Sequence, residues 1–331
     1  MSYACPVCEA SLADASVGEY AQCPSCGCYV YVSDARAEDD NKAFYDGVYP
    51  HLGGGKRNSV KKAILRAFQK KDAALHPGEY HAQRDMRAEI QQVFQRPRRS
   101  VEIGFGEGRM LVRLLEAGLD AYGVDISENV VSSFRQKHPQ YRDRVAIGSH
   151  FGQKVDVVYC SALLEHLDRP ACFLQEVSAM LQEGGLLIID NLPVLNPDQP
   201  SIALEEDISF WKPCHRIIYS AEGLKTFFSR LGYSLTRFAM VDLFNYRVLS
   251  LHIRRGFPEI IRLRHSCLRS PRLPGIIEYW FLCREALRIK SQAVAASYIF
   301  TRTSVTPPLR CAGDLNASVI SRVKISRPSV R

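Results

Sequence analysis

A glutamate and a histidine stand side by side in the stretch "CSALLEHLDRP", directly after an apolar run that is typical of a strand. They are Glu165 and His166. Histidine is the usual proton acceptor near neutral pH when a hydroxyl or an activated carbon is the nucleophile. A histidine that caps or packs at the start of the next helix is the competing interpretation. We therefore take His166 as a candidate general base and Glu165 as a candidate substrate contact.

Trp211, His215 and Tyr219 follow one another at intervals of four in the insertion "PVLNPDQPSIALEEDISFWKPCHRIIYS". Their side chains could stack on a ring-like acceptor or hydrogen-bond to it. The same spacing fits one face of a helical turn that simply packs. We expect His215 to be the second candidate for acid–base catalysis, and Trp211 and Tyr219 to be substrate contacts.

The stretch "VEIGFGEGRML" places Gly104, Gly106 and Gly108 between a strand-like run and a helix-like run. This spacing differs from the Gly-x-Gly-x-x-Gly pattern of dinucleotide-binding loops. Glu102 lies two residues before the first glycine, where its carboxylate would repel a pyrophosphate. The same carboxylate suits a ligand that carries an ammonium group and a sulfonium. An ordinary strand-to-helix corner is the alternative interpretation.

A second acidic residue, Asp125, ends the next predicted strand 21 residues after Gly104. A carboxylate at that strand end can accept hydrogen bonds from both ribose hydroxyls. Ile126 beside it could pack against adenine. The pattern therefore favours a cationic cofactor that contains a nucleoside.

Strands and helices alternate along the middle of the chain, which predicts an α/β fold with an open, doubly wound, mostly parallel sheet. The ligand crevice of such a sheet lies beyond the carboxyl ends of its strands. Strands are expected at 99–105, 120–126, 144–148, 154–160, 185–192, 234–242 and 246–255, the last two as an antiparallel hairpin, and helices at 108–118, 127–138, 169–185 and 220–233.

Four ordered motifs, "VEIGFGEG", "GVDIS", "DVVYCSALLEHLDRP" and "LQEGGLLIID", resemble those of class I S-adenosylmethionine-dependent methyltransferases. The resemblance covers residues 98–255 and implies a seven-stranded Rossmann-like sheet. It also implies that the three glycines surround the methionine moiety, that Glu102 supports that loop or the amino group, and that Asp125 holds the ribose. Cys160 is expected among the cofactor contacts. Ser149 stands where the family often has an acidic residue near adenine, so the adenine contacts depart from the family pattern.

The Glu-His pair resembles that of small-molecule O- and C-methyltransferases, including quinone and sugar modifiers. The expected acceptor is therefore a small molecule, a sugar or glycan, or a quinone-like compound. Some relatives bind a metal through Glu-x-x-Glu-His, but Ala162 occupies the first position here, so a catalytic metal is not expected. An RNA methyltransferase and a non-catalytic protein that binds a partner are the alternatives.

Two Cys-x-x-Cys pairs near the start, Cys5 with Cys8 and Cys23 with Cys26, predict a structural zinc site. Four thiolates from two tight loops can surround one tetrahedral Zn²⁺ and close its coordination shell. Disulfides are the competing interpretation. Cys28 is an extra thiol beside the second pair and is not expected to bind the metal.

The chain is expected to have four segments: a zinc ribbon at 1–33, a linker with two helices at 34–97, the cofactor-binding core at 98–255, and a basic, partly helical C-terminal extension at 256–331. The two helices could form a lid over the site or simply pack against the core.

Net charge is +8, and it is concentrated towards the C-terminus. From Tyr246 onwards there are 16 Lys and Arg against 4 Asp and Glu, whereas the rest carries 27 against 31. The basic extension predicts a peripheral contact with an anionic membrane surface, or a solvated or flexible end. The core and ribbon are not basic, which argues against nucleic-acid binding. No secretory signal and no apolar span of about 18 residues are evident, which predicts a cytoplasmic protein.

Overall fold

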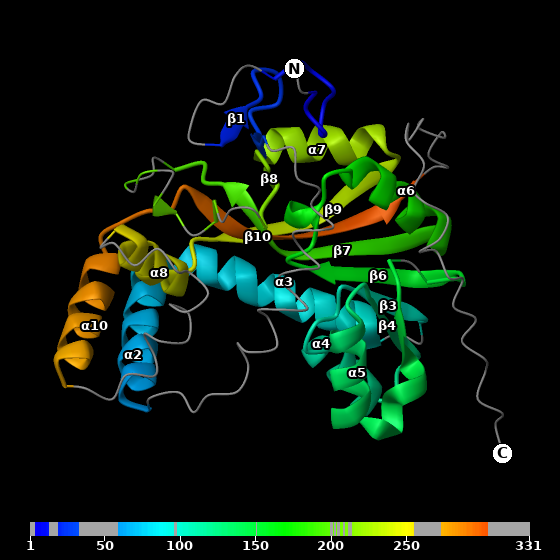
Figure 1. Cartoon of the computed structure of the whole chain (residues 1–331), viewed down its shortest axis with the longest axis horizontal. Helices are drawn as coiled ribbons and strands as arrows, with labels where there is room; N and C mark the ends of the chain where they lie inside the picture. Colours follow the sequence, from blue (N-terminus) through cyan, green and yellow to red (C-terminus); the bar gives the residue numbers. More distant parts are fainter. Residues whose placement is uncertain are drawn as a thin grey trace.

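Among the described residues, seven strands form one mixed sheet (Figure 1). The computed structural model describes residues 4–12, 19–32, 59–95, 98–149, 151–198, 201, 203, 206–207, 209–210, 214–254 and 273–303. The strands are β3 (Ser100–Ile103), β4 (Ala121–Asp125), β5 (Val145–Ile147), β6 (Val155–Ser161), β7 (Leu181–Leu195), β9 (Tyr233–Val241) and β10 (Ala293–Arg302). Their order is β5-β4-β3-β6-β7-β10-β9, with β10 antiparallel to both of its neighbours and the other pairs parallel. The predicted doubly wound α/β class is confirmed.

Helices cover both faces of this sheet, which is why most residues of its central strands are buried. On one face lie α3 (Pro77–Gln95), α4 (Arg109–Glu116) and α5 (Glu128–Lys137), and on the other lie α6 (Pro170–Met180) and α7 (Ala221–Arg230). Each layer has its own core of buried side chains against the sheet. Two short 3-10 helices, η3 (Pro139–Arg144) and η4 (Leu164–His166), complete the connections.

Two helices begin with serine caps, Ser127 and Ser220. Ser127 Oγ accepts a hydrogen bond from Val130 N at 3.3 Å, and Ser220 Oγ accepts one from Gly223 N at 2.9 Å. Each cap satisfies one of the backbone amides that a helix start leaves unpaired. The caps fix where α5 and α7 begin, directly after the segments that carry Asp125 and the insertion.

The predicted strand at 246–255 is wrong, because this segment is a helix, α8 (Phe244–Arg254). Phe244, Val248 and Leu251 recur at intervals of four and three and are all buried, which is the spacing of a helical face. The partner of β9 is instead β10, which also pairs with β7. The sheet therefore takes a strand from beyond residue 255, where we expected the core to end.

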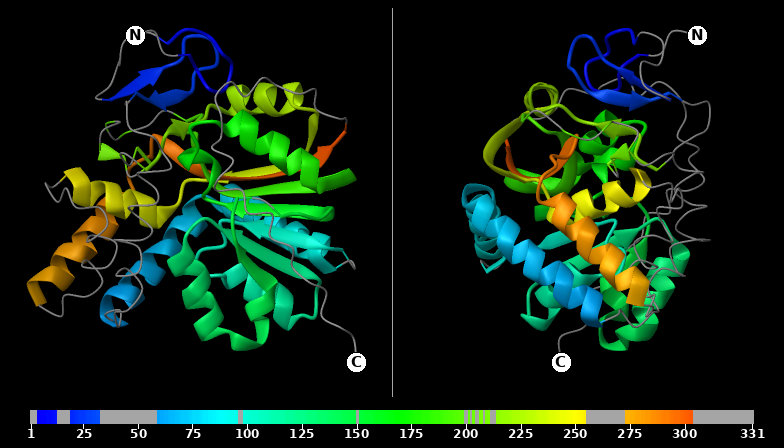
Figure 2. Two further views of the ribbon diagram at one scale, coloured as in Figure 1. Left: turned by 45° about the vertical axis from the view of Figure 1, so that its right-hand side comes forward. Right: turned by 90° about the vertical axis from the view of Figure 1, so that its left-hand side faces the viewer.

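The two helices predicted within 34–97 are present as α2 (Ser59–Leu75) and α3 (Pro77–Gln95). The helix α2 packs with α8 and α10 (Leu273–Ala286) in a separate apolar cluster beside the sheet (Figure 2). Within it the buried Arg247 pairs with Asp72, which also accepts a hydrogen bond from Tyr80 at 2.8 Å. Both helices thus pack against other elements of the fold.

The N-terminal segment forms a small antiparallel sheet with a strand from far along the chain. Its strands are β1 (Tyr20–Gln22), β2 (Tyr29–Tyr31) and β8 (Ile217–Ile218), in that order. Because β8 belongs to the insertion, the ribbon is attached to the core by strand pairing and lies next to α7 (Figure 2). Within the described part of the chain, no helix is long and apolar enough to cross a membrane.

Candidate functional site

Three glycines shape the loop between β3 and α4. Gly104, Gly106 and Gly108 have φ angles of +69°, +52° and +67°, in the left-handed region that side chains disfavour. A Cβ atom on Gly108 would lie 2.4 Å from the Phe134 ring, and one on Gly104 would lie 3.2 Å from Leu163. The loop therefore requires glycine for its backbone angles and, at Gly108, for space as well.

Glu102 holds the start of α4 from inside the sheet. Its Oε2 accepts a hydrogen bond from Leu111 N at 2.9 Å, one of the amides that the helix start leaves unpaired. Burial and the nearby charge of Asp125 raise the pKa of Glu102 to about 8. Of its two predicted roles, this geometry favours support of the loop.

Asp125 joins the end of β4 to the same loop. Its Oδ2 accepts a hydrogen bond from Gly106 N at 3.1 Å, and its Oδ1 accepts one from Ser127 N at 3.0 Å. Ile126 beside it is 50% exposed, and Ser149 is exposed just beyond β5. The parallel pairing of β4 with β5 brings these residues to the carboxyl edge of the sheet, where ligands of such sheets bind.

Cys160 is not brought to that open edge. Its side chain is fully buried, and its Sγ lies 3.8 Å from the carbonyl oxygen of Ile188. It packs in the core with apolar neighbours, so its position does not support the predicted cofactor contact.

The Glu-His pair and His215 come together although 49 positions separate the two histidines. The rings of His166 and His215 have centroids 4.9 Å apart and an interplanar angle of 75°. His166 Nε2 lies 3.9 Å from Glu165 Oε1. Each of the three residues offers one atom that could bind a metal, and these atoms lie within 4.8 Å of one another. The three side chains therefore form one compact cluster.

Both histidines use Nδ1 towards a backbone carbonyl. His166 Nδ1 lies 2.7 Å from Cys214 O, and His215 Nδ1 lies 2.7 Å from Ser209 O. A carbonyl can only accept, so Nδ1 carries the proton in each ring and the neutral Nε2 is a proton acceptor. Burial, with His215 nearby, lowers the pKa of His166 to about 3, and burial lowers that of His215 to about 4. Both rings are neutral at pH 7.

Glu165 is 1% exposed, and burial raises its pKa to about 8. Its Oε2 has no hydrogen-bond partner among the described residues. Its backbone oxygen accepts a hydrogen bond from Arg216 N at 2.6 Å, and the Arg216 side chain pairs with Asp168 at 2.8 Å. These contacts hold the insertion against η4, so the position of His215 depends on both segments.

The two aromatic residues predicted to contact substrate have different outcomes. Tyr219 is fully buried, and its hydroxyl donates to Leu164 O at 3.3 Å, so it supports η4 from the core. Trp211 lies outside the described residues. Sequence reasoning missed Ser209, Cys214 and Arg216, whose backbone atoms orient the cluster, because backbone contacts leave no side-chain signature.

The four predicted zinc ligands also converge. Cys5 and Cys26 have sulfur atoms 3.6 Å apart, and Cys8 and Cys23 have sulfur atoms 3.4 Å apart. All four sulfur atoms lie within 4.8 Å of one another, and none of these thiols forms a disulfide. A tetrahedral site with Zn–S bonds of about 2.3 Å needs sulfur atoms about 3.8 Å apart. The donor set therefore fits zinc.

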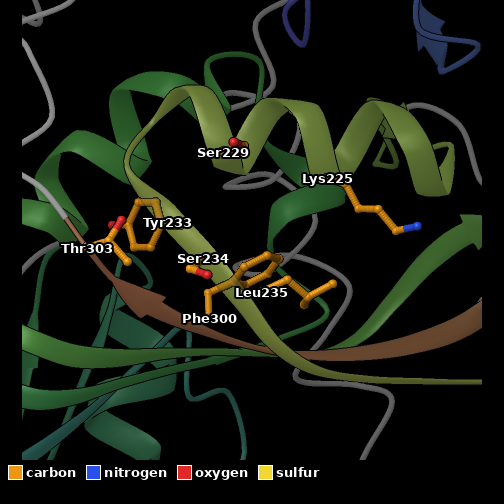
Figure 3. Close-up of a pocket in the computed structure, with 7 residues that line it drawn as sticks. All are labelled: Lys225, Ser229, Tyr233, Ser234, Leu235, Phe300 and Thr303. Carbon is orange, nitrogen blue, oxygen red and sulfur yellow. The ribbon is translucent and has the colours of Figure 1, made fainter.

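A hollow between α7 and the edge strands lies away from these sites (Figure 3). It is bordered by the start of β9 and the end of β10. Because β10 is antiparallel to β7, with Thr301 opposite Leu186, this hollow is at the amino edge of the parallel strands. It is therefore separate from the ligand edge. Its lining residues are Lys225, Ser229, Tyr233, Ser234, Leu235, Phe300 and Thr303.

Residues 79–237 match a family model described as a methyltransferase domain. A ubiquinone biosynthesis O-methyltransferase of Methylococcus capsulatus is 28% identical over 103 residues, which are 29% of this chain and 44% of that protein. A tRNA U34 carboxymethyltransferase of Idiomarina loihiensis is 26% identical over 147 residues, 41% of this chain and 45% of that protein. The chain spans less than half the length of these relatives.

Among solved structures, a magnesium protoporphyrin IX methyltransferase of Synechocystis PCC 6803 has 14% identity and a TM-score of 0.45, covering 82% of this chain and 99% of that one. A geranyl diphosphate C-methyltransferase of Streptomyces coelicolor A3(2) has 16% identity and a TM-score of 0.48, and the match covers 82% of this chain and 100% of that one.

The strand order, the glycine loop and the acidic strand end define a class I S-adenosylmethionine-dependent methyltransferase fold. The match to the methyltransferase domain model falls on residues 79–237, which contain this loop and this strand end. The four-cysteine cluster adds an N-terminal unit consistent with a zinc ribbon.

Proposed function

We propose that this protein transfers a methyl group from S-adenosylmethionine to a hydroxyl or carbon of a small molecule, a sugar or glycan, or a quinone-like acceptor. The observation that carries this proposal is the pair of neutral histidines, His166 and His215. Their Nε2 atoms are held as proton acceptors beside the ligand edge of the sheet. Such a pair suits acceptors that lose a proton on methylation.

The cofactor would be held by the loop and the acidic strand end. Gly104, Gly106 and Gly108 would surround its methionine portion, and Asp125 would accept the ribose hydroxyls. Ile126 and Ser149 would border the adenine, since both are exposed at the same edge. When bound, the cofactor supplies an electrophilic methyl group.

This chain's residues would then align the acceptor and remove its proton. Methyl transfer would form the bond to the acceptor oxygen or carbon as the methyl–sulfur bond breaks, and the proton of the acceptor would pass to Nε2 of a histidine. His215 is only partly buried and His166 is buried, so His215 would face the acceptor more directly. Glu165 would contact the acceptor or orient the pair, because its Oε2 lies in this cluster and has no hydrogen-bond partner among the described residues. Burial of Glu165 and His166 would strengthen each polar contact there.

The four cysteines would hold a structural Zn²⁺ that stabilises the ribbon. With four thiolates the coordination shell is closed, which suits a structural role and leaves no open position for catalysis. We also propose that the basic C-terminal extension makes a peripheral membrane contact and that the protein is cytoplasmic.

An RNA acceptor is the second candidate, because one of the relatives is named as a tRNA-modifying enzyme. Incubating the protein with cell fractions and S-adenosylmethionine tritiated on its methyl group, with and without ribonuclease, distinguishes the small-molecule acceptor from the RNA acceptor. Label that enters an organic-soluble or glycan fraction and survives ribonuclease supports the small-molecule proposal. Label that is lost with ribonuclease favours the RNA alternative.

Cofactor binding is tested without knowing the acceptor. Calorimetric titration with S-adenosylhomocysteine should show binding to the wild type and at least about tenfold weaker binding to Asp125→Ala, since each tenfold corresponds to about 1.4 kcal/mol of lost contacts. Absence of binding to the wild type would overturn the proposed activity.

A further inference from the structure

The ribbon is attached to the insertion at the residue next to His215. Strand β2 pairs with β8, with Tyr29 opposite Ile218 and Val30 opposite Ile217. The pairing continues at Tyr31, whose N–H donates to the Arg216 carbonyl at 2.8 Å. A backbone ladder therefore ends one residue away from the histidine that the proposed function places in the acceptor site.

Tyr20 makes the next contact, directly to His215. Its hydroxyl donates to the His215 carbonyl oxygen at 2.7 Å, and the tyrosine is 1% exposed. The Tyr20 ring is fixed by edge-to-face packing on Phe210, at 5.3 Å, and by the Tyr31 ring, at 5.4 Å. A buried hydroxyl on a rigid ring sets the position of its acceptor closely.

The zinc loop holds the other end of the same segment. Ser220, which caps α7, donates through Oγ to the Cys26 carbonyl, and its N–H donates to Cys28 Sγ at 3.3 Å. At the far end of α7, Arg230 pairs with Glu9 at 2.9 Å. The stretch from 215 to 220 is thus held by the ribbon at both ends.

We propose that Tyr20 is a positioning residue for His215, and that the four-cysteine ribbon belongs to the acceptor site because it fixes the backbone that carries this histidine. The proposal rests on the proposed function, which assigns the histidine pair to proton transfer. Tyr20 acts through the His215 carbonyl, whereas Ser209 O orients the imidazole at Nδ1. Proton transfer requires the ring to be placed to within about 1 Å. The two hydrogen bonds, one to the backbone and one to the ring of His215, provide that placement.

The test follows the His215 ring directly and needs no acceptor. Protein labelled with ¹³C and ¹⁵N in histidine is titrated by NMR in the presence of S-adenosylhomocysteine, with His215→Gln to assign the signal. The test variant is Tyr20→Phe, which removes one oxygen atom. The matched control is Tyr29→Phe, because the Tyr29 ring also packs edge-to-face on Phe210, at 5.5 Å.

In the wild type, His215 should stay neutral, with the proton on Nδ1, until about pH 4. Tyr20→Phe should release the backbone, admit water and move the titration of His215 upward by at least about one pH unit, towards the ordinary value of about 6.5. The shift is upward because burial disfavours the charged ring, and contact with water removes that penalty. The neighbouring titratable and charged groups, whose charges also affect the pKa of His215, are His166 and Glu165 of η4, and Arg216 with its partner Asp168.

Zinc content and affinity for S-adenosylhomocysteine should be unchanged in both variants. An unchanged His215 titration in folded Tyr20→Phe overturns the proposal, and so does an equal shift in Tyr29→Phe, which would assign the effect to ribbon packing. Should Tyr20→Phe fail to fold, 3-fluorotyrosine at position 20 keeps the ring and makes the hydroxyl a stronger donor. The chemical shifts of His215 should then move, and no movement overturns the proposal.

These outcomes are distinguishable from failure of the proposed function. If His166→Gln and His215→Gln keep full methyl transfer once an acceptor is found, the assigned proton transfer fails. The NMR result would still report whether the ribbon sets the geometry of His215.

Discussion

Replacing Gly108 by alanine adds one methyl group to the cofactor loop, and the structure gives two separate costs. The backbone at Gly108 has φ +67°, and a side chain in this left-handed region costs about 1–2 kcal/mol. The new Cβ would lie 2.4 Å and 2.6 Å from two carbon atoms of the Phe134 ring. That ring is 3% exposed and packs edge-to-face on Phe105 at 5.3 Å. Overpacking of this kind costs about 1–3 kcal/mol.

The free energy of unfolding of Gly108→Ala should therefore fall by about 2–5 kcal/mol in total, the sum of those two costs. Gly118→Ala is the matched control, because Gly118 has φ +74° and a Cβ there would meet nothing within 4 Å. It should lose only the backbone contribution of about 1–2 kcal/mol. The difference between the variants isolates the contact with Phe134.

Equilibrium urea unfolding measures the free energy of unfolding of both variants. Calorimetric titration measures their affinity for S-adenosylhomocysteine, which reports on the glycine loop. We expect Gly108→Ala to bind at least about tenfold more weakly, which corresponds to about 1.4 kcal/mol, and Gly118→Ala to bind like the wild type. Equal destabilisation of the two variants would refute the steric argument. Full affinity in Gly108→Ala would refute the assignment of this loop to the cofactor.

Three further predictions concern the other clusters. Asp72→Ala should lower the free energy of unfolding by up to about 3–5 kcal/mol in urea titrations, because it removes one of the two carboxylates that pair with the buried Arg247 and leaves only Asp242; a loss below about 1 kcal/mol, the value of an exposed pair, would contradict this. Cys23→Ser should lose bound zinc and Cys28→Ser should keep it, as measured by metal analysis, since only the first belongs to the four-thiolate cluster; equal loss would count against that cluster. Burial lowers the pKa of His166 to about 3, so the unfolded chain takes up this proton first below about pH 6.5. The stability that this group contributes is present above that pH and is lost as pH falls. His166→Gln should therefore lose less stability than the wild type between pH 7 and pH 5. An unchanged slope of the free energy of unfolding against pH would exclude the effect.

The doubly wound sheet could be predicted from local patterns, because each βα unit carries its own signals. Apolar runs mark the strands, and Ser127 and Ser220 cap the helices that follow. The glycine loop and Asp125 could be placed at one edge because parallel strands end on the same side. These inferences need only neighbouring residues and the handedness of the chain.

The last strand could not be placed correctly because its pairing is not local. Residues 246–255 and Ala293–Arg302 are both apolar enough for a strand, and only the spacing of Phe244, Val248 and Leu251 favours the helix over the first of them. A hairpin with β9 was the nearer choice in sequence. The structure instead inserts β10 between β7 and β9, after the intervening helices α8 and α10.

The cluster of Glu165, His166 and His215 depends on contacts that leave no trace in composition or spacing. The cysteine pairs predict a metal site, and Glu165 and His166 predict an acid–base group, but nothing in either pattern links them. The link is β8, two residues long, which joins the ribbon sheet at Ile217 and Ile218 and so fixes the backbone next to His215. A two-residue strand is too short to be stable alone, so it needs the ribbon, and the ribbon would need the proposed zinc ion to fold. If zinc is bound there, removing it should therefore disturb the histidine pair before it disturbs the glycine loop, whose hydrogen bonds to Asp125 and Glu102 lie within the sheet and α4.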